Sequence, residues 1–119
     1  MSGKDLLALY SRYVDVEALP WAPAAFAGIE QKVLFEDPAR GVRTLLMRWA
    51  AGAELPMHEH TDVEQTFVLE GSLADHEGEC KAGGFVWRPA GSRHRAWSPQ
   101  GCLLLAIFLK PNTFGPSAV

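Results

Sequence analysis

Two histidines one residue apart, followed four residues later by a carboxylate, could together bind a metal ion. His58, His60 and Glu64 stand in the stretch GAELPMHEHTDVEQTFVLEG, which begins at residue 52. On a β-strand, residues i and i+2 face the same side, so the two imidazoles would project together ~6.6 Å apart along the chain. Imidazole nitrogens at that separation can converge on one ion, at bond lengths of about 2.1 Å. The stretch therefore predicts part of a metal site.

A complete site needs the chain to bend and a further ligand to arrive. Glu64 shares the parity of the histidines, but on one straight strand it would lie roughly 13 Å beyond His60. The polar pair that follows His60 allows a bend, which would place Glu64 on a neighbouring strand beside the histidines. The segment RPAGSRHRAW then delivers His94 after a tight turn of proline and glycine. Three imidazoles and one carboxylate suit Fe, Mn, Zn, Co or Ni.

Other polar side chains near these segments have simpler interpretations. His76 lies between two expected strands and is interpreted as a surface turn residue. Three arginines flank the second segment and could steer an anionic substrate, but solvated or interface positions are favoured: Arg88, Arg93 and Arg95. Two of these, Arg93 and Arg95, have parity opposite to His94 and should point away from the metal. For the four candidate ligands, His58, His60, Glu64 and His94, the alternative is a β-barrel whose histidines no longer hold a metal ion.

Composition limits what the protein can be. The 119 residues suffice for one domain, with 48% hydrophobic and 21% charged residues, as in ordinary globular proteins. A net charge of −3 argues against nucleic acid and anionic membrane surfaces as partners. The apolar run CLLLAIFL is too short to span a membrane, and the N-terminus predicts no signal peptide. Cys80 and Cys102 are interpreted as small buried hydrophobes in a cytoplasmic protein.

The elements that must position the candidate ligands are mostly strands. Apolar residues at helical spacing predict one short helix at the N-terminus, capped by Ser2 and ended before Pro20. Residues 20–28 form a connector rich in proline and alanine, whose aromatic residues should pack on the barrel, and strands follow over residues 29–110. Short strands separated by turn signals predict an all-β sandwich or barrel. We expect a single domain over residues 1–119, with residues 1–28 packed on the barrel of residues 29–110.

These residues resemble the two motifs of the cupin superfamily. The first motif, G-x5-H-x-H-x3-E-x6-G, is matched by Gly52, His58, His60, Glu64 and Gly71. The second, G-x5-P-x-G-x2-H, is matched by Gly83, Pro89, Gly91 and His94, and Ser98 stands where an asparagine often follows. The resemblance implies an RmlC-like antiparallel jelly-roll β-barrel with the metal inside and substrate entering at the open end.

A looser similarity extends over most of the chain. Segments such as KVLFEDPARGVRTLL and PQGCLLLAIF resemble the cupin subfamily of ChrR anti-sigma factors, and also the acetylacetone-cleaving and dihydroxyacetophenone-cleaving dioxygenases. The first resemblance implies a zinc-binding module that accompanies a separate anti-sigma module. The second implies an Fe(II) enzyme that splits a carbon–carbon bond with O2. Because the sequence leaves no room for an anti-sigma module ahead of Pro20, an enzyme is favoured.

The resulting expectation is a metal-dependent cupin that acts as a dioxygenase on a small diketone or hydroxyketone. The metal ligands would be His58, His60, Glu64 and His94, around one divalent ion, Fe²⁺ or Zn²⁺ before Mn²⁺, Ni²⁺ or Co²⁺. A non-catalytic zinc sensor and a non-redox cupin such as an isomerase are the alternatives. The apolar outer positions Phe67 and Leu69, and the two-sided apolar strand at residues 102–109, predict a homodimer.

Overall fold

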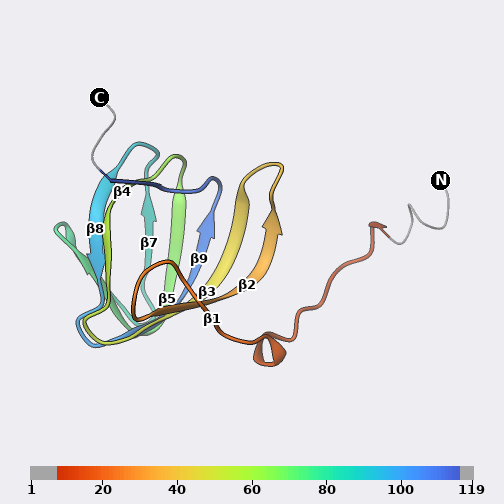
Figure 1. Cartoon of the computed structure of the whole chain (residues 1–119), viewed down its shortest axis with the longest axis horizontal. Helices are drawn as coiled ribbons and strands as arrows, with labels where there is room; N and C mark the ends of the chain where they lie inside the picture. The colour runs from red at the N-terminus through yellow and green to blue at the C-terminus, as the bar shows by residue number, and fades with distance from the viewer. Residues whose placement is uncertain (1–7, 116–119) are drawn as a thin grey trace.

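The strands of this protein form one continuous curled antiparallel sheet. The computed structural model describes residues 8–115 (Figure 1). It contains one 3-10 turn, η1 (Val16–Ala18), and the strands β1 (Ala22–Pro23), β2 (Ile29–Asp37), β3 (Val42–Trp49), β4 (Glu54–Glu59), β5 (Glu64–Asp75), β6 (Gly78–Lys81), β7 (Phe85–Arg88), β8 (Arg93–Trp97), β9 (Cys102–Phe108) and β10 (Thr113–Phe114).

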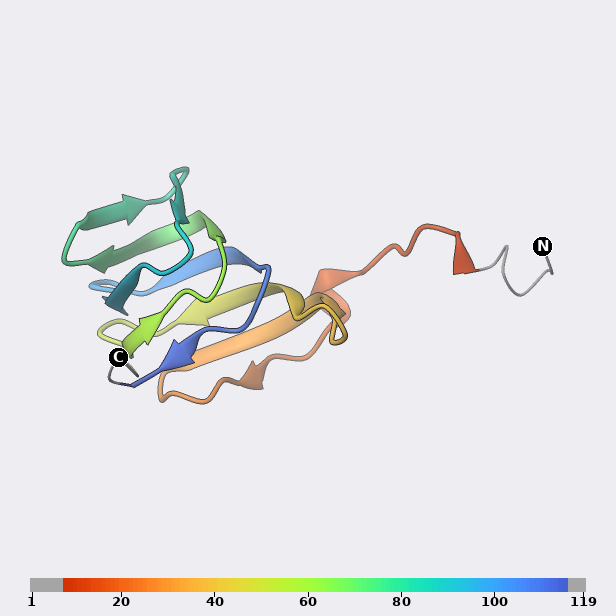
Figure 2. The same ribbon diagram turned by 90° about the horizontal axis from the view of Figure 1, so that it is seen from above.

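The strand order closes the sheet around an interior. Neighbours follow the order β1-β2-β3-β9-β5-β8-β4-β10, with β6 and β7 both paired to β5. Every strand pairing among the described residues is antiparallel. Seen from above, the sheet curls so that β4 and β8 face β2 and β3 across the interior (Figure 2). The predicted all-β antiparallel jelly-roll barrel is confirmed.

Alternation along the strands decides which side chains enter the barrel. On β3, Leu45, Met47 and Trp49 are buried, while their neighbours point outward. Cys102, Leu104 and Ala106 repeat this pattern on β9. Every second side chain of a strand lies on the same face of the sheet. The buried side chains of β3 and β9 therefore contribute to one core.

Gly71 lets β5 belong to both halves of the barrel. Residues 64–71 of β5 pair with β9, whereas residues 72–75 pair with β6 and Ala74 pairs with β8. Gly71 has φ of 71°, and a Cβ there would lie 1.9 Å from the carbonyl oxygen of Gly101. Only glycine fits a left-handed conformation at such a close approach of two backbones.

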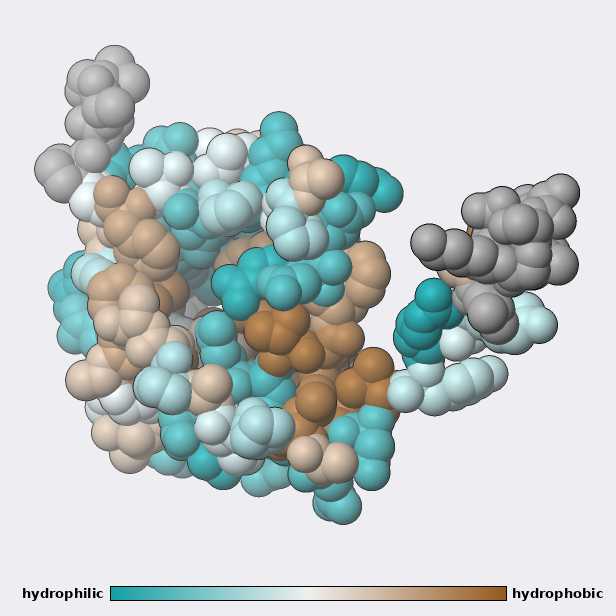
Figure 3. Space-filling view, turned by 45° about the vertical axis from the view of Figure 1, so that its right-hand side comes forward, coloured by the Kyte–Doolittle hydropathy of each residue, from teal (hydrophilic) through white to brown (hydrophobic). Residues whose placement is uncertain are grey.

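The predicted N-terminal helix is wrong in the part of the chain that the structure describes. Its first turn, with Ser2, lies outside the described residues. Among residues 9–19, the 3-10 turn η1 is the only helical element. A short amphipathic helix is stabilised by packing its apolar face, and Tyr13 is 96% exposed on a segment that stands clear of the barrel (Figure 3).

The connector after this segment does contact the barrel. The Trp21 ring lies against Lys32 and Arg48, with 4.8 and 4.2 Å from the ring centroid to their charged groups. Lys32 also donates a hydrogen bond to the carbonyl oxygen of Val16. Residues 16–21 thus cover part of the outer face of β2. Among residues 8–115, no helix is long and apolar enough to cross a membrane.

Candidate metal centre

Three histidines from two neighbouring strands converge inside the barrel. His58 lies on β4 directly opposite His94 on β8, and His60 follows the end of β4. All three side chains are buried, and one ring nitrogen of each lies within 4.8 Å of the others. The ring centroids are 4.6 to 5.0 Å apart. Three buried imidazoles this close could hold one metal ion.

Hydrogen bonds fix which nitrogen of each histidine faces the centre. Nδ1 of His58 donates to the carbonyl oxygen of Pro56 at 2.8 Å. Nδ1 of His60 lies 2.9 Å from Oγ of Ser92, and Nδ1 of His94 lies 2.9 Å from Oδ2 of Asp75. With the proton held on Nδ1, each Nε2 keeps its lone pair free. This is the arrangement in which metal-binding histidines are oriented by partners behind them.

Glu64, at the start of β5, contacts the cluster through His60, although the group that could hold an ion comprises only the three histidines. Its Oε2 lies 2.8 Å from Nε2 of His60, as the predicted bend requires. Despite that short distance, neither atom meets the geometry of a hydrogen bond, and both are buried without another partner among the described residues. Buried polar atoms are normally satisfied. Two unsatisfied acceptors aimed at one place fit a cation, so these residues are suited to a divalent metal.

The protonation states also favour cation binding. Burial lowers the pKa of His94 to about 4, despite the opposing effect of the hydrogen bond that His94 donates to Asp75. Burial likewise lowers the pKa of His58. For Glu64, burial acts to raise the pKa, but the interactions with His60 and the other two histidines outweigh it and the pKa is lowered. Neutral imidazoles beside an ionised carboxylate are the forms that ligate metals.

Asp75 and Arg88 support His94 and were not predicted to do so. Oδ1 of Asp75 accepts hydrogen bonds from the backbone N–H groups of Glu77 and Gly78, while Oδ2 contacts His94 and lies 2.5 Å from Arg88. Arg88, assigned from sequence to solvent or an interface, instead anchors this buried carboxylate. A signal was present, because Asp75 ends the run SLAD, in which both faces of β5 are buried. Ser92, which orients His60, carried no comparable signal.

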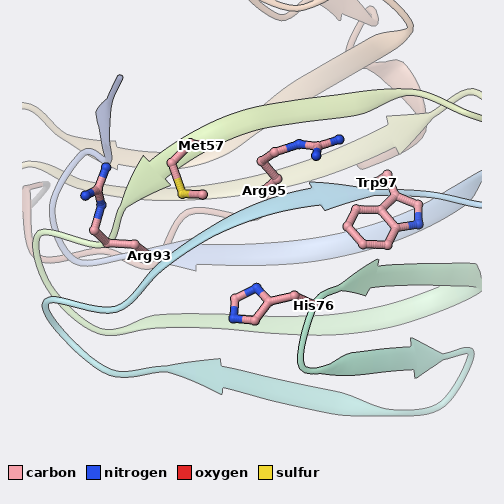
Figure 4. A pocket seen from close by; sticks show the side chains of 5 residues that line it. All are labelled: Met57, His76, Arg93, Arg95 and Trp97. Carbon is pink, nitrogen blue, oxygen red and sulfur yellow. The ribbon is translucent and has the colours of Figure 1, made fainter. Parts of the chain in front are cut away.

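The remaining candidates lie outside the barrel. Arg93, Arg95 and His76 line a shallow hollow on the outer side of β4 and β8, together with Met57 and Trp97 (Figure 4). Arg95 pairs there with Glu54, and Arg93 donates a hydrogen bond to the carbonyl oxygen of Gly115. The prediction that Arg93 and Arg95 point away from the histidines is confirmed.

Both cysteines were predicted to be buried, which is confirmed for Cys102, whereas Cys80 is half-buried. Both are free thiols. Burial raises the pKa of Cys80 and of Cys102, which leaves both in the unreactive thiol form at neutral pH.

Solved structures with this fold include enzymes and a regulator. A candidate acetylacetone dioxygenase from Methylibium petroleiphilum PM1 is 27% identical, with a TM-score of 0.83 over 91% of this chain and 83% of that chain. An acetylacetone dioxygenase from Acinetobacter johnsonii is 21% identical, with a TM-score of 0.75 over 91% of this chain and 78% of that one. The anti-sigma factor ChrR of Rhodobacter sphaeroides, solved with SigE, is 23% identical, with a TM-score of 0.66 over 78% of this chain and 50% of that one.

At the sequence level, a search of curated proteins found no match. The profile of the ChrR cupin-like domain, in contrast, matches residues 10–112. That range contains the strands from β1 to β9, all three histidines and Glu64. The chain therefore belongs to the ChrR cupin-like domain family.

Proposed function

We propose that this protein binds one divalent metal ion and uses it to cleave a small diketone or hydroxyketone with O2. The ligands would be Nε2 of His58, His60 and His94 and a carboxylate oxygen of Glu64. One observation carries the proposal: Nδ1 of each of these three buried histidines has a hydrogen-bond partner, which leaves its Nε2 available to an ion, and Oε2 of Glu64 lies 2.8 Å from Nε2 of His60.

The residues around the ion would prepare the site rather than react. A bound ion such as Fe²⁺ would supply Lewis acidity and coordination positions for a β-diketone substrate. Asp75 keeps His94 in the Nδ1–H form by accepting a hydrogen bond from Nδ1. Ser92 does the same for His60 through a neutral hydroxyl, whose own proton goes to the carbonyl oxygen of Pro89.

Metal content and oxygen consumption test this proposal together. Protein purified without added metal should contain about one Fe or Mn per chain, and the Fe²⁺ form should consume O2 when given acetylacetone. His60→Ala should lose both metal and oxygen uptake. The matched control is His76→Ala, which removes the one histidine outside the barrel and should leave both unchanged. Oxygen uptake that persists in His60→Ala would overturn the proposal.

A zinc-binding regulatory module is the second candidate, and the match to the ChrR cupin-like profile favours it. A zinc ion held by four protein ligands in a tetrahedron has no position left for substrate. Zinc as the bound metal, together with no oxygen uptake after iron is substituted, would support the regulator. Spectra of a Co²⁺-substituted protein would distinguish a closed four-coordinate site from an open one.

We also propose that the protein is a cytoplasmic homodimer. Two free cysteines are typical of proteins in reducing compartments.

A further inference from the structure

A cavity of about 260 Å³ lies between the connector, the inner face of β2 and β3, and the C-terminal segment. Its walls are mainly apolar and include Leu45, Met47 and Phe108. The polar side chains of Gln31 and Arg43 also line it. An apolar cavity with few polar groups is the usual form of a small-molecule site.

Phe114 joins this cavity to the candidate metal centre. β10 pairs with β4 so that Phe114 lies opposite His58, and the two rings are 5.3 Å apart between centroids. Phe114 also contacts Phe26 of the connector, at 5.0 Å between centroids. In Figure 1 the C-terminal segment crosses from β9 to β4 at one end of the barrel. A ligand in the cavity would therefore lie beside the ring that packs on His58.

Arg43 is the charged group of this cavity. It shares the inward parity of Leu45 and Met47 on β3, and its side chain is 37% exposed. Its Nε is buried and has no hydrogen-bond partner among the described residues. The nearest carboxylate oxygen, of Glu36, lies 3.7 Å away, which is an ion-pair distance but too long for a hydrogen bond. A buried donor without an acceptor is costly unless a ligand satisfies it.

We infer that this cavity binds a small organic anion, with an apolar body in the cavity and a carboxylate on Arg43. The inference rests on the proposed function and narrows its substrate to a diketone or hydroxyketone that carries a carboxylate. The oxo groups would reach the metal past Phe114, and the guanidinium would receive the far end. Arg43 would then determine specificity, because a neutral diketone leaves its Nε unpaired. Glu36 would compete weakly for the same guanidinium, since it is itself half exposed.

Benzoate and benzamide test the charge preference, because they share size and shape and differ in charge. Calorimetry on the metal-free protein isolates Arg43 from any metal–ligand bond. Benzoate should bind about tenfold or more tightly than benzamide. Arg43→Gln should abolish that preference, while Arg40→Gln should keep it. Arg40 is a matched control, since it lies in the β2–β3 turn with its side chain 78% exposed.

Equal binding of the two probes, or a preference that survives in Arg43→Gln, would overturn the inference. If Arg43→Gln does not fold, Arg43→Met serves instead, because it removes the charge and keeps a long unbranched side chain. A preference for benzoate that survives in Arg43→Met would equally overturn the inference. A preference for benzoate over benzamide in a protein that does not retain metal would count against the proposed function alone. Metal retention without that preference would count against this inference alone.

Discussion

At the scale of single residues, the candidate centre depends on pairs rather than on isolated ligands. Each imidazole is held by an acceptor behind it, but the acceptors differ in charge. His58 faces a backbone carbonyl and His60 a serine, whereas His94 faces the carboxylate of Asp75. A carboxylate behind a ligand raises its basicity and fixes its orientation more strongly than a neutral group. His94 should therefore be the ligand most sensitive to its support.

Asp75→Asn tests this support. The substitution removes the charge behind His94 and leaves Arg88 without its buried partner, so metal affinity should fall by about 10- to 100-fold. Competition with a chromogenic chelator would measure it. Glu77→Gln is the control, because Glu77 lies 3.9 Å from the same arginine but is largely exposed. Equal affinities for Asp75→Asn and the unmodified protein would show that Asp75 only shapes the turn.

The lowered pKa of His94 makes a prediction about the metal-free protein in acid. Between an ordinary pKa of 6.5 and the folded value of about 4, the unfolded chain binds more protons than the folded one. The free energy of unfolding therefore rises with pH. The contribution of His94, on the order of 3 kcal/mol, is lost as the pH falls from 6.5 towards 4. Urea unfolding at pH 7 and pH 4.5 would measure it, and His94→Gln should weaken the dependence. Stability that is flat or rises in acid would contradict the assigned pKa.

At the scale of elements, one strand connects the two halves of the barrel. β5 presents Glu64 to the candidate centre at one end and Asp75 at the other, with Gly71 between them. With the turn in β5 at Gly71, one end of the strand contacts His60 and the other contacts His94. β5 therefore contributes both a candidate ligand, Glu64, and a residue that orients another ligand, Asp75, and the conformation of Gly71 lies between them.

Gly71→Ala should destabilise the fold by at least about 2 kcal/mol, because it adds both left-handed strain and a backbone clash. Gly78→Ala is the control, since a Cβ there meets no heavy atom within 4 Å. That variant should stay within about 0.5 kcal/mol of the unmodified protein. Thermal or urea unfolding would compare the two. Equal stabilities would mean that β5 can bend elsewhere.

The barrel and the histidine cluster could be predicted from the sequence, whereas the residues that hold the histidines in place could not. Alternation of apolar residues and glycine-marked turns is a local property, so the strands could be predicted from it. The spacing of His58 and His60 is also local. The contact between Asp75 and His94 joins residues on different strands, and no local pattern reports it. The predicted N-terminal helix is wrong within the described residues for the opposite reason. Its local apolar pattern is present, but the segment has no surface on which to pack.

At the scale of the whole molecule, apolar side chains form a row across the outer face of the sheet. Strand register places Phe85, Phe67, Leu105 and Leu46 side by side on β7, β5, β9 and β3. Phe67 is 39% exposed and Phe85 is 55% exposed. Exposed apolar patches of this kind mark interaction sites. The uncovered row is the surface on which the proposed homodimer would form.

Light scattering should therefore give a mass near twice the 13.0 kDa of one chain. The double variant Phe67→Lys, Phe85→Lys should shift the protein to a monomer, because it places two charges within the apolar row. Met57→Lys is the matched control, since Met57 is also 39% exposed but lies on the outer face of β4. A monomer at micromolar concentration before any substitution would contradict the proposal.

Metal removal should lower the stability of the whole molecule. Ligands from β4, the β4–β5 bend, β5 and β8 would be tied together by one ion, and an ion that binds only the folded state stabilises it by linkage. Chelation should reduce the melting temperature by several degrees in calorimetry. Removing metal from His76→Ala should give the same reduction. An unchanged melting temperature, with metal loss verified, would separate the site from the stability of the fold.

The position of β4 in the sheet has a kinetic consequence. β4 is bonded to β8 on one side, but on the other its only partner within residues 8–115 is the two-residue strand β10. Two of the candidate ligands, His58 and His60, thus sit on or beside a strand that is nearly an edge. A bound ion would link this strand to β8 and close it against local opening. The lifetime of the bound ion would then be set by how often β4 separates from its neighbour, so metal exchange and backbone hydrogen exchange in β4 should slow together.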